Sequence, residues 1–111
     1  MYSKQKEAEL IKADNINNLA DYYIYDNKPD NDAKAEKMLT GRIKETKDIN
    51  EKFICMLTLS EYYCIRNDLK KVKKLLVELK GMLPQLDDRL KGNYEMIFNA
   101  ANDMYTMMQE L

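Results

Sequence analysis

The sequence predicts an all-α protein of about five helices, in which two antiparallel helical hairpins are followed by a long C-terminal capping helix. Apolar residues recur every three or four positions along most of the chain, which is the period of an α-helix. The chain has only three glycines and two prolines, too few for the turns of a many-stranded sheet. A short pattern in the first helical stretch also returns 40 residues later. At 111 residues, the chain is expected to form a single domain over residues 1–111.

The first hairpin is expected in the N-terminal part of the chain. A helical stretch runs from about residue 4 to residue 27, and the asparagines around position 17 are poor helix formers that favour a break there. Pro29 is interpreted as part of the loop that ends this stretch, and one of the three residues after it is expected to cap the next helix. That helix is predicted over about residues 33–47.

The second hairpin carries the clearest helix signals. Asp48 is the predicted N-cap of a helix over about residues 49–66, with Glu51 three residues later as its capping-box partner. The following helix, over about residues 69–83, has apolar residues at spacings of three and four. It is expected to end before Pro84, because the residue before a proline is disfavoured in the helical conformation.

The last helix is predicted over about residues 86–111. Its main stripe keeps an a/d spacing for three heptads: Leu90, Tyr94, Ile97, Ala101, Met104, Met108 and Leu111. Further apolar residues lie on other sides of this helix. One side is expected to pack on the hairpins, and the surplus is either covered by the chain's own fold or used for self-association. The residues predicted for self-association are Met104, Tyr105, Met107 and Met108.

The internal repeat points to a known architecture. Residues 19–24 match residues 59–64 as apolar, small, acidic, tyrosine, tyrosine and apolar. In the second hairpin, the spacing of seven residues resembles that of the tetratricopeptide repeat: Met56, Leu59, Ser60, Tyr63, Val72, Leu76 and Pro84. The sequence is also similar to the degenerate repeats of the Rap- and Rgg-like peptide receptors of Gram-positive bacteria, because it is rich in tyrosine, lysine and asparagine. The domain then comprises repeat one at about 13–47, repeat two at about 49–84 and a terminal helix at about 86–111.

The resemblance implies a binding groove lined by the first helix of each repeat. The lining positions that it carries over, and that we predict to bind a partner, are Asn17, Asp21, Tyr25, Ile54, Leu57, Glu61 and Ile65. These residue types suit a peptide, because an amide bonds a peptide backbone, carboxylates take a basic side chain and apolar residues seat an anchor. In the alternative interpretation, the chain's own last helix covers the apolar members.

No residue pattern indicates a reaction or a metal site. The chain has no histidine, which removes the commonest general base and the commonest metal ligand. No Cys-x-x-Cys, Gly-x-Gly-x-x-Gly or phosphate-loop pattern is present. We therefore expect no enzyme, no catalytic residue, no metal and no cofactor. Cys55 and Cys64 are interpreted as small apolar residues in a reducing compartment.

Charge and hydropathy narrow the classes of partner. The formal charge is −1, from 18 basic and 19 acidic residues, so no net field favours nucleic acid, and we do not expect it as a partner. The lysines at 70, 71, 73 and 74 are interpreted as a solvated helix face. No run of 18 apolar residues occurs, and we expect no secretory signal. We expect a cytoplasmic protein without a membrane partner.

The function predicted from these observations is that of a non-enzymatic adaptor or scaffold that binds a protein or a peptide. The alternative is a homo-oligomerising structural or regulatory module that uses its methionine-rich C-terminal helix, such as a bacterial, phage or mobile-element regulator that masks a partner protein. Helical arrays usually need about three repeats, and this chain has two and a fragment. We therefore expect a homodimer or a longer parent chain.

Overall fold

The computed structural model describes residues 4–13, 16–25 and 29–110, with the side chains of 29–32 excepted. Within these residues the chain forms α-helices and one 3₁₀ helix and contains no strand, so the all-α prediction is confirmed. The elements are α1 (Lys4–Ala13), α2 (Ile16–Ile24), α3 (Pro29–Glu45), α4 (Ile49–Ile65), α5 (Leu69–Met82), the 3₁₀ helix η1 (Leu83–Gln85) and α6 (Asp88–Gln109). Six α-helices replace the five expected, because the first helical stretch is two helices.

The start of α3 differs from the prediction. Pro29 is the first residue of this helix and does not belong to a loop. The first turn of a helix has no intrahelical partner for its N–H groups, so the missing N–H of proline costs nothing there, and the fixed φ of proline suits the helix. The positions expected to cap the helix, 30–32, therefore lie inside its first turn.

The N-terminus of α4 is capped as predicted, but without a capping box. Asp48 Oδ1 accepts a hydrogen bond from the backbone N–H of Asn50 at 2.9 Å. The N–H of Asp48 itself donates to Thr46 Oγ1 at 3.2 Å. Glu51, which was expected to accept that N–H, instead pairs with Arg42 of α3 at 3.0 Å. Competition from a nearby cation explains the difference, since the full charge of Arg42 attracts the Glu51 carboxylate more strongly than a backbone N–H does, and Thr46 already accepts the N–H of Asp48.

A short turn places α5 antiparallel to α4. Asn67 adopts a left-handed backbone with φ of 59°, a conformation that asparagine tolerates better than most residues. The next N–H, of Asp68, donates to the carbonyl of Tyr63 at 2.9 Å, which closes the end of α4. Asp68 Oδ1 in turn accepts the N–H of Lys71 and caps α5.

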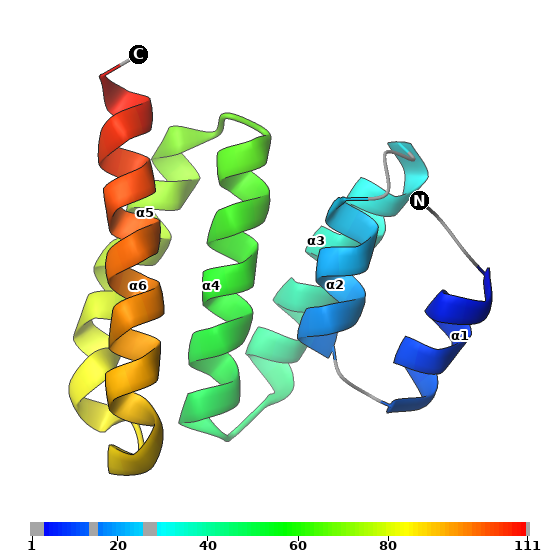
Figure 1. Ribbon diagram of the computed structural model, residues 1–111, viewed down its shortest axis with the longest axis horizontal. Coiled ribbons are helices and arrows are strands. Elements are labelled where there is room, and N and C mark those ends of the chain that lie inside the picture. The colour runs from blue at the N-terminus through cyan, green and yellow to red at the C-terminus, as the bar shows by residue number, and fades with distance from the viewer. Residues whose placement is uncertain (1–3, 14–15, 26–28, 111) are drawn as a thin grey trace.

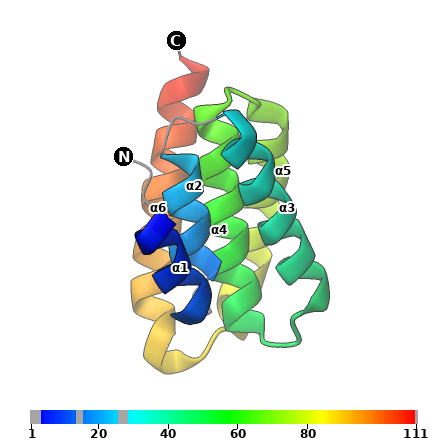
Figure 2. The same cartoon turned by 90° about the vertical axis from the view of Figure 1, so that its right-hand side faces the viewer.

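Helix α4 is the centre of the molecule. It packs against α2, α3, α5 and α6, and lies between the α2–α3 pair and the α5–α6 pair (Figure 1). Helices α2 to α6 alternate in direction along the chain (Figure 1). At right angles to this view, α3 and α5 lie on the opposite side of α4 from α6 (Figure 2). Helix α1 packs on α2 at the outer edge and has no buried residue.

Two hydrophobic clusters meet at α4. The cluster on one side joins α2, α3 and α4 and includes Leu19, Ala20, Tyr23, Ala35, Leu39, Cys55, Leu59 and Tyr62. The cluster on the other side joins α4, α5 and α6 and includes Phe53, Met56, Leu57, Val72, Leu76, Leu79, Phe98 and Tyr105. Nine of the 17 residues of α4 are buried. This two-sided burial explains why α4 is apolar on more than one face.

Helix α6 is rotated relative to the predicted a/d stripe, so that only part of the stripe packs on the core, namely Tyr94, Ala101 and Met108. Ile97 and Met104, two members of that stripe, are 40% and 52% exposed. Phe98 and Tyr105, which are not members, are 6% and 9% exposed and belong to the core. Aromatic side chains bury the largest apolar area, so their packing between α4 and α5 decides the rotation of the helix.

Candidate functional site

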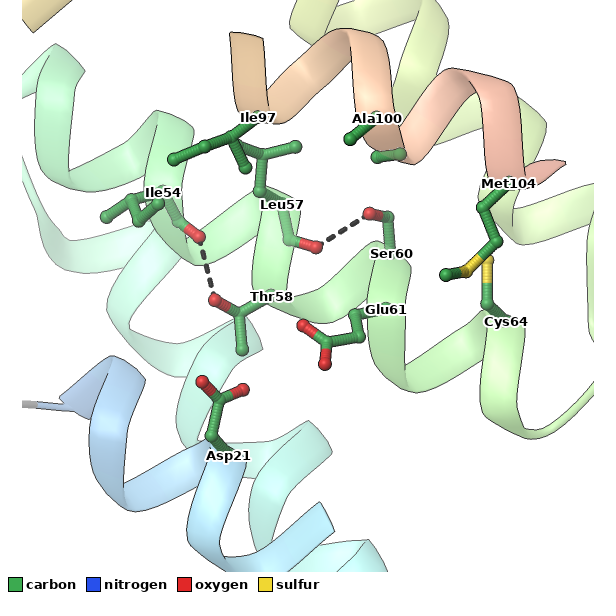
Figure 3. Close-up of a pocket in the computed structure, with 11 residues that line it drawn as sticks. Asp21, Ile54, Leu57, Thr58, Ser60, Glu61, Cys64, Ile97, Ala100 and Met104 are labelled. Carbon is green, nitrogen blue, oxygen red and sulfur yellow. Dashed lines mark hydrogen bonds between the residues drawn. The ribbon is translucent and has the colours of Figure 1, made fainter. Parts of the chain in front are cut away.

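A pocket of about 330 Å³ lies between α4 and α6 and reaches α2 at one edge (Figure 3). Its lining residues are Asp21 of α2, Ile54, Leu57, Thr58, Ser60, Glu61 and Cys64 of α4, and Ile97, Ala100, Ala101 and Met104 of α6. We call this pocket the α4–α6 groove. It lies on the face of α4 on which a partner was predicted to bind.

Short side chains create the groove. Ser60 on α4 faces Ala100 on α6 across it, and Cys64 lies beside Met104 (Figure 3). The Ser60 hydroxyl donates to the carbonyl of Leu57 at 2.6 Å, so its own helix satisfies it. Protein interiors are otherwise close-packed, and longer side chains at these positions would fill the space. The gap between α4 and α6 therefore remains open to another molecule.

The long sides of the groove are apolar. Ile54 and Leu57 form the α4 wall, and Ile97 and Met104 form the α6 wall (Figure 3). The two α6 side chains are about half exposed, at 40% and 52%. Exposed apolar surface next to a pocket is typical of a binding site.

The edge nearest α2 is acidic. Asp21 points from α2 toward Glu61 and Thr58 of α4 (Figure 3). Burial, and then the charge of Glu61, raise the pKa of Asp21 to about 6. The Asp21 Oδ1 atom is buried and has no hydrogen-bond partner among the described residues. A buried acceptor without a donor is unfavourable, so this carboxyl is a weak point of the isolated fold.

The second carboxylate is held in place. Glu61 accepts a hydrogen bond from the hydroxyl of Tyr25, which extends from the end of α2. This bond, followed by burial and by the charges of Glu61 and Asp21, raises the pKa of the Tyr25 hydroxyl, so it remains a donor. No ion pair joins either carboxylate to a lysine or arginine in the part of the chain that the structure describes. Lys6 of α1 lines a neighbouring shallow pocket together with Asp21.

The structure brings most of the predicted partner-binding residues together. Asp21, Ile54, Leu57 and Glu61 line the groove, while Asn17 and Tyr25 adjoin it through Thr58 and Glu61. Ile65 is 51% exposed but does not line the groove. Leu57 is only 5% exposed and also belongs to the core, so the alternative of cover by the last helix holds for this residue.

The α6 wall is the part of the groove that sequence analysis assigned to other roles. Ile97 was expected in the packing stripe, and Met104 was expected both there and in the self-association surface. The signal was present as Ile97-x-x-Ala100-Ala101-x-x-Met104, because a pair of alanines between two large apolar residues leaves a gap when the helix packs.

The residues predicted for self-association separate into two groups. Met104 and Met107 are 52% and 68% exposed. Tyr105 is 9% exposed and Met108 packs against the same core cluster, so the prediction is corrected for these two. They occupy the side of α6 that faces α4 and α5, which leaves little of them for a partner chain.

The remaining features with a chemical interpretation belong to the fold. Tyr63 donates to Glu36 at 2.7 Å and packs edge to face on Tyr62 at 5.3 Å. Cys55 and Cys64 are buried free thiols, and burial raises the pKa of Cys55 to about 11. Among the described residues, no three groups of the histidine, cysteine and carboxylate type are placed to hold a metal ion. None of the helices so described has the length and apolar character needed to cross a membrane.

Comparison with known proteins gives no match: no family model, no curated protein and no solved structure is significantly similar to this chain.

Proposed function

We propose that this protein is a non-enzymatic adaptor whose α4–α6 groove holds a segment of a partner protein or a peptide. The observation that carries the proposal is the open groove itself, with apolar walls and an acidic edge. Its 330 Å³ is at the lower end of the range of roughly 300–1,000 Å³ for small-molecule pockets, so it suits one or two inserted side chains. Between Ile54 and Cys64 it follows α4 for about 15 Å, at ~1.5 Å per residue, which is enough for a short peptide.

The packing of the helices supports a repeat-like scaffold. Helix α2 packs on α3 and α4 packs on α5, and α4 also contacts α2 and α6, the helices that run in its own direction (Figure 1). In tetratricopeptide-like arrays the first helices of successive repeats line the groove, and the pocket found here lies among α2, α4 and α6. An adaptor with two hairpins and a capping helix fits these contacts.

The proposal is tested with peptides selected from a random library displayed on phage. Their affinity for the intact chain is measured by fluorescence anisotropy, and then for Met104→Glu and for the matched control Met107→Glu. Both methionines are exposed on α6, but only Met104 lines the groove. Binding should weaken at least tenfold in Met104→Glu and remain within twofold in Met107→Glu. Equal effects of the two substitutions, or no effect of either, would contradict the proposal.

The second candidate function is self-association through α6, and one observation favours it. Met96, Ile97, Met104 and Met107 are exposed and, at about 100° per residue, lie with Ala100 on an arc of about 100° of this helix. Met104→Glu and Met107→Glu should then each shift a dimer toward monomer, which light scattering over a concentration series would measure. A mass that equals the monomer at all concentrations would exclude this candidate, including the version in which a dimeric regulator masks a partner.

A further inference from the structure

The acidic edge of the groove is more than a solvated pair of surface charges. Asp21 and Glu61 come from different helices and their carboxyl groups point to the same side of the pocket (Figure 3). Asp21 Oδ1 is buried without a partner, and the charge of Glu61 makes ionisation of Asp21 still less favourable. Two close carboxylates destabilise each other unless a cation lies between them. The isolated fold therefore carries an electrostatic cost that a cationic ligand would remove.

The pair is also preorganised for such a ligand. The Tyr25 hydroxyl holds one oxygen of Glu61, and the other oxygen is free of hydrogen bonds to described residues. Asp21 is partly buried on a helix that packs directly on α4. A ligand would consequently lose little free energy in ordering these side chains.

The shape of the groove selects the kind of cation. Beside the carboxylates, the groove is lined by Leu57, Ala100 and Met104, so a small hydrated cation would leave its apolar part unfilled. Long basic side chains bury their aliphatic stems along apolar surface and keep the charged head at its edge. An extended basic side chain therefore matches both the walls and the edge.

The presence of two carboxylates favours arginine over lysine. A guanidinium has five N–H donors in a planar fork and can bond two carboxylates at once, whereas an ammonium is a compact and strongly hydrated charge. We infer that the groove recognises a partner segment that presents an arginine, with its aliphatic stem against Ala100 and Met104 and its guanidinium between Asp21 and Glu61. This inference rests on the proposed function and adds the chemistry of the ligand to it.

The affinity of the groove for an arginine should depend on pH. The titratable and charged groups next to Asp21 are Glu61 of α4, Tyr25 just after α2, and Lys6 and Tyr22, which line a neighbouring pocket together with Asp21. Because the pKa of Asp21 is about 6, its carboxyl is largely protonated at pH 5 and ionised at pH 7.5. A guanidinium stabilises only the ionised form, so affinity should rise about tenfold between pH 5 and pH 7.5.

The direct test uses Nα-acetyl-arginine methylamide as the probe and the citrulline analogue as its neutral, nearly isosteric control. The chain is labelled with ¹³C at the methionine methyl groups, so that Met104 reports on the groove and Met107 on the exposed surface beside it. Titration at pH 7.5 should shift the Met104 methyl signal with arginine, at least fivefold less with citrulline, and leave Met107 unchanged. Equal shifts with the two probes, or no shift of Met104, would overturn the inference.

Substitutions test whether each of the two carboxylates binds the arginine probe. Asp21→Asn and Glu61→Gln should each lower the affinity for the arginine probe at least fivefold. Glu95→Gln, at an exposed position of α6, is the matched control and should leave this affinity unchanged. Asp21→Asn should also abolish the pH dependence between pH 5 and pH 7.5. A pH dependence that is retained in Asp21→Asn would contradict the role of this residue.

The selected library peptides separate the inference from the proposed function. If they shift Met104 but bind equally well with arginine replaced by citrulline, the groove is a peptide site without the inferred specificity. If they leave Met104 unshifted and ignore the groove substitutions, the proposed function fails as well.

Discussion

Helices α2 and α4 carry the same six-residue pattern and have different surroundings. Each has a buried or half-buried tyrosine, Tyr23 or Tyr63, whose ring lies under a lysine of the following helix, at 5.5 Å and 5.0 Å. Helix α4 has neighbours on both sides, whereas α2 has α1, without a buried residue, on its outer side. The comparison shows that the neighbouring helices, more than the local sequence pattern, decide how a repeated residue packs.

The acidic position of the pattern shows the same effect. Asp21 and Glu61 are equivalent in the two copies, and the packing of α2 on α4 brings them to one edge of the groove. Glu61 has the hydroxyl of Tyr25 as a donor, while Asp21 Oδ1 has none among the described residues. The repeated acid on α2 and α4 thus forms the acidic edge of the groove, because the two copies face one another.

The largest expected effect tests the central place of α4. Phe53 is fully buried in the cluster of α4, α5 and α6, and Phe53→Ala should lower the free energy of unfolding by about 4 kcal/mol, since it leaves a large cavity. Ile11→Ala on α1, where the side chain is 56% exposed, is the control and should change it by less than about 0.5 kcal/mol. Urea denaturation followed by circular dichroism measures both. Similar effects of the two substitutions would refute the central role of α4.

The two tyrosines at the same repeat position test the difference between α2 and α4. Tyr63→Phe removes the bond to Glu36 that ties α4 to α3 and should lower the free energy of unfolding by about 1 kcal/mol. Tyr23→Phe removes the bond to Glu7 of α1 and should mainly release α1 from α2. Hydrogen exchange by mass spectrometry should then show faster exchange over residues 4–13 in Tyr23→Phe alone. Equal exchange of α1 in the two variants would contradict this assignment.

The acidic pair gives a pH-dependent prediction. A raised pKa means that the folded state disfavours the ionised Asp21, so this residue lowers stability as the pH rises through about 6. Asp21→Asn should therefore raise the free energy of unfolding at pH 7.5 by about 1 kcal/mol, a value reduced for the partial exposure of the carboxyl. The gain should disappear as the pH falls toward 4.

Denaturation curves at several pH values test this prediction. Asp103→Asn, at an exposed position of α6, is the matched control and should show no such trend. A gain in Asp21→Asn that is equal at pH 4 and pH 7.5 would mean that charge is not its cause.

The smallest expected effect concerns the exposed methionines. Met104→Glu and Met107→Glu should each change the free energy of unfolding by less than about 0.5 kcal/mol, because both side chains are more than half exposed. Circular dichroism and thermal denaturation check this. Their near-equal stability makes them a fair pair for comparing binding, and a large loss in Met104→Glu alone would show that the groove supports the fold itself.

Much of the architecture could be predicted from the sequence by itself. The apolar period, the cap at Asp48 and the scarcity of glycine and proline determined an all-α chain, because helix formation depends on neighbours three and four residues apart. A break in the first helical stretch was also predicted, although Asn17 and Asn18 lie inside α2, which begins at Ile16. The resemblance also predicted Asp21, Leu57 and Glu61 as groove positions, and in the structure all three line the α4–α6 groove.

Only the tertiary structure decided the rotation of α6, and with it the second wall of the groove. A helix with apolar residues on several sides has no preferred face by itself, and the packing of Phe98 and Tyr105 between α4 and α5 selected one. That choice buried Tyr105, exposed Met104, and left Ala100 opposite Ser60 with a gap between them. The pocket and the burial of Asp21 Oδ1 depend on contacts between residues about 40 or 80 positions apart, which no local pattern specifies.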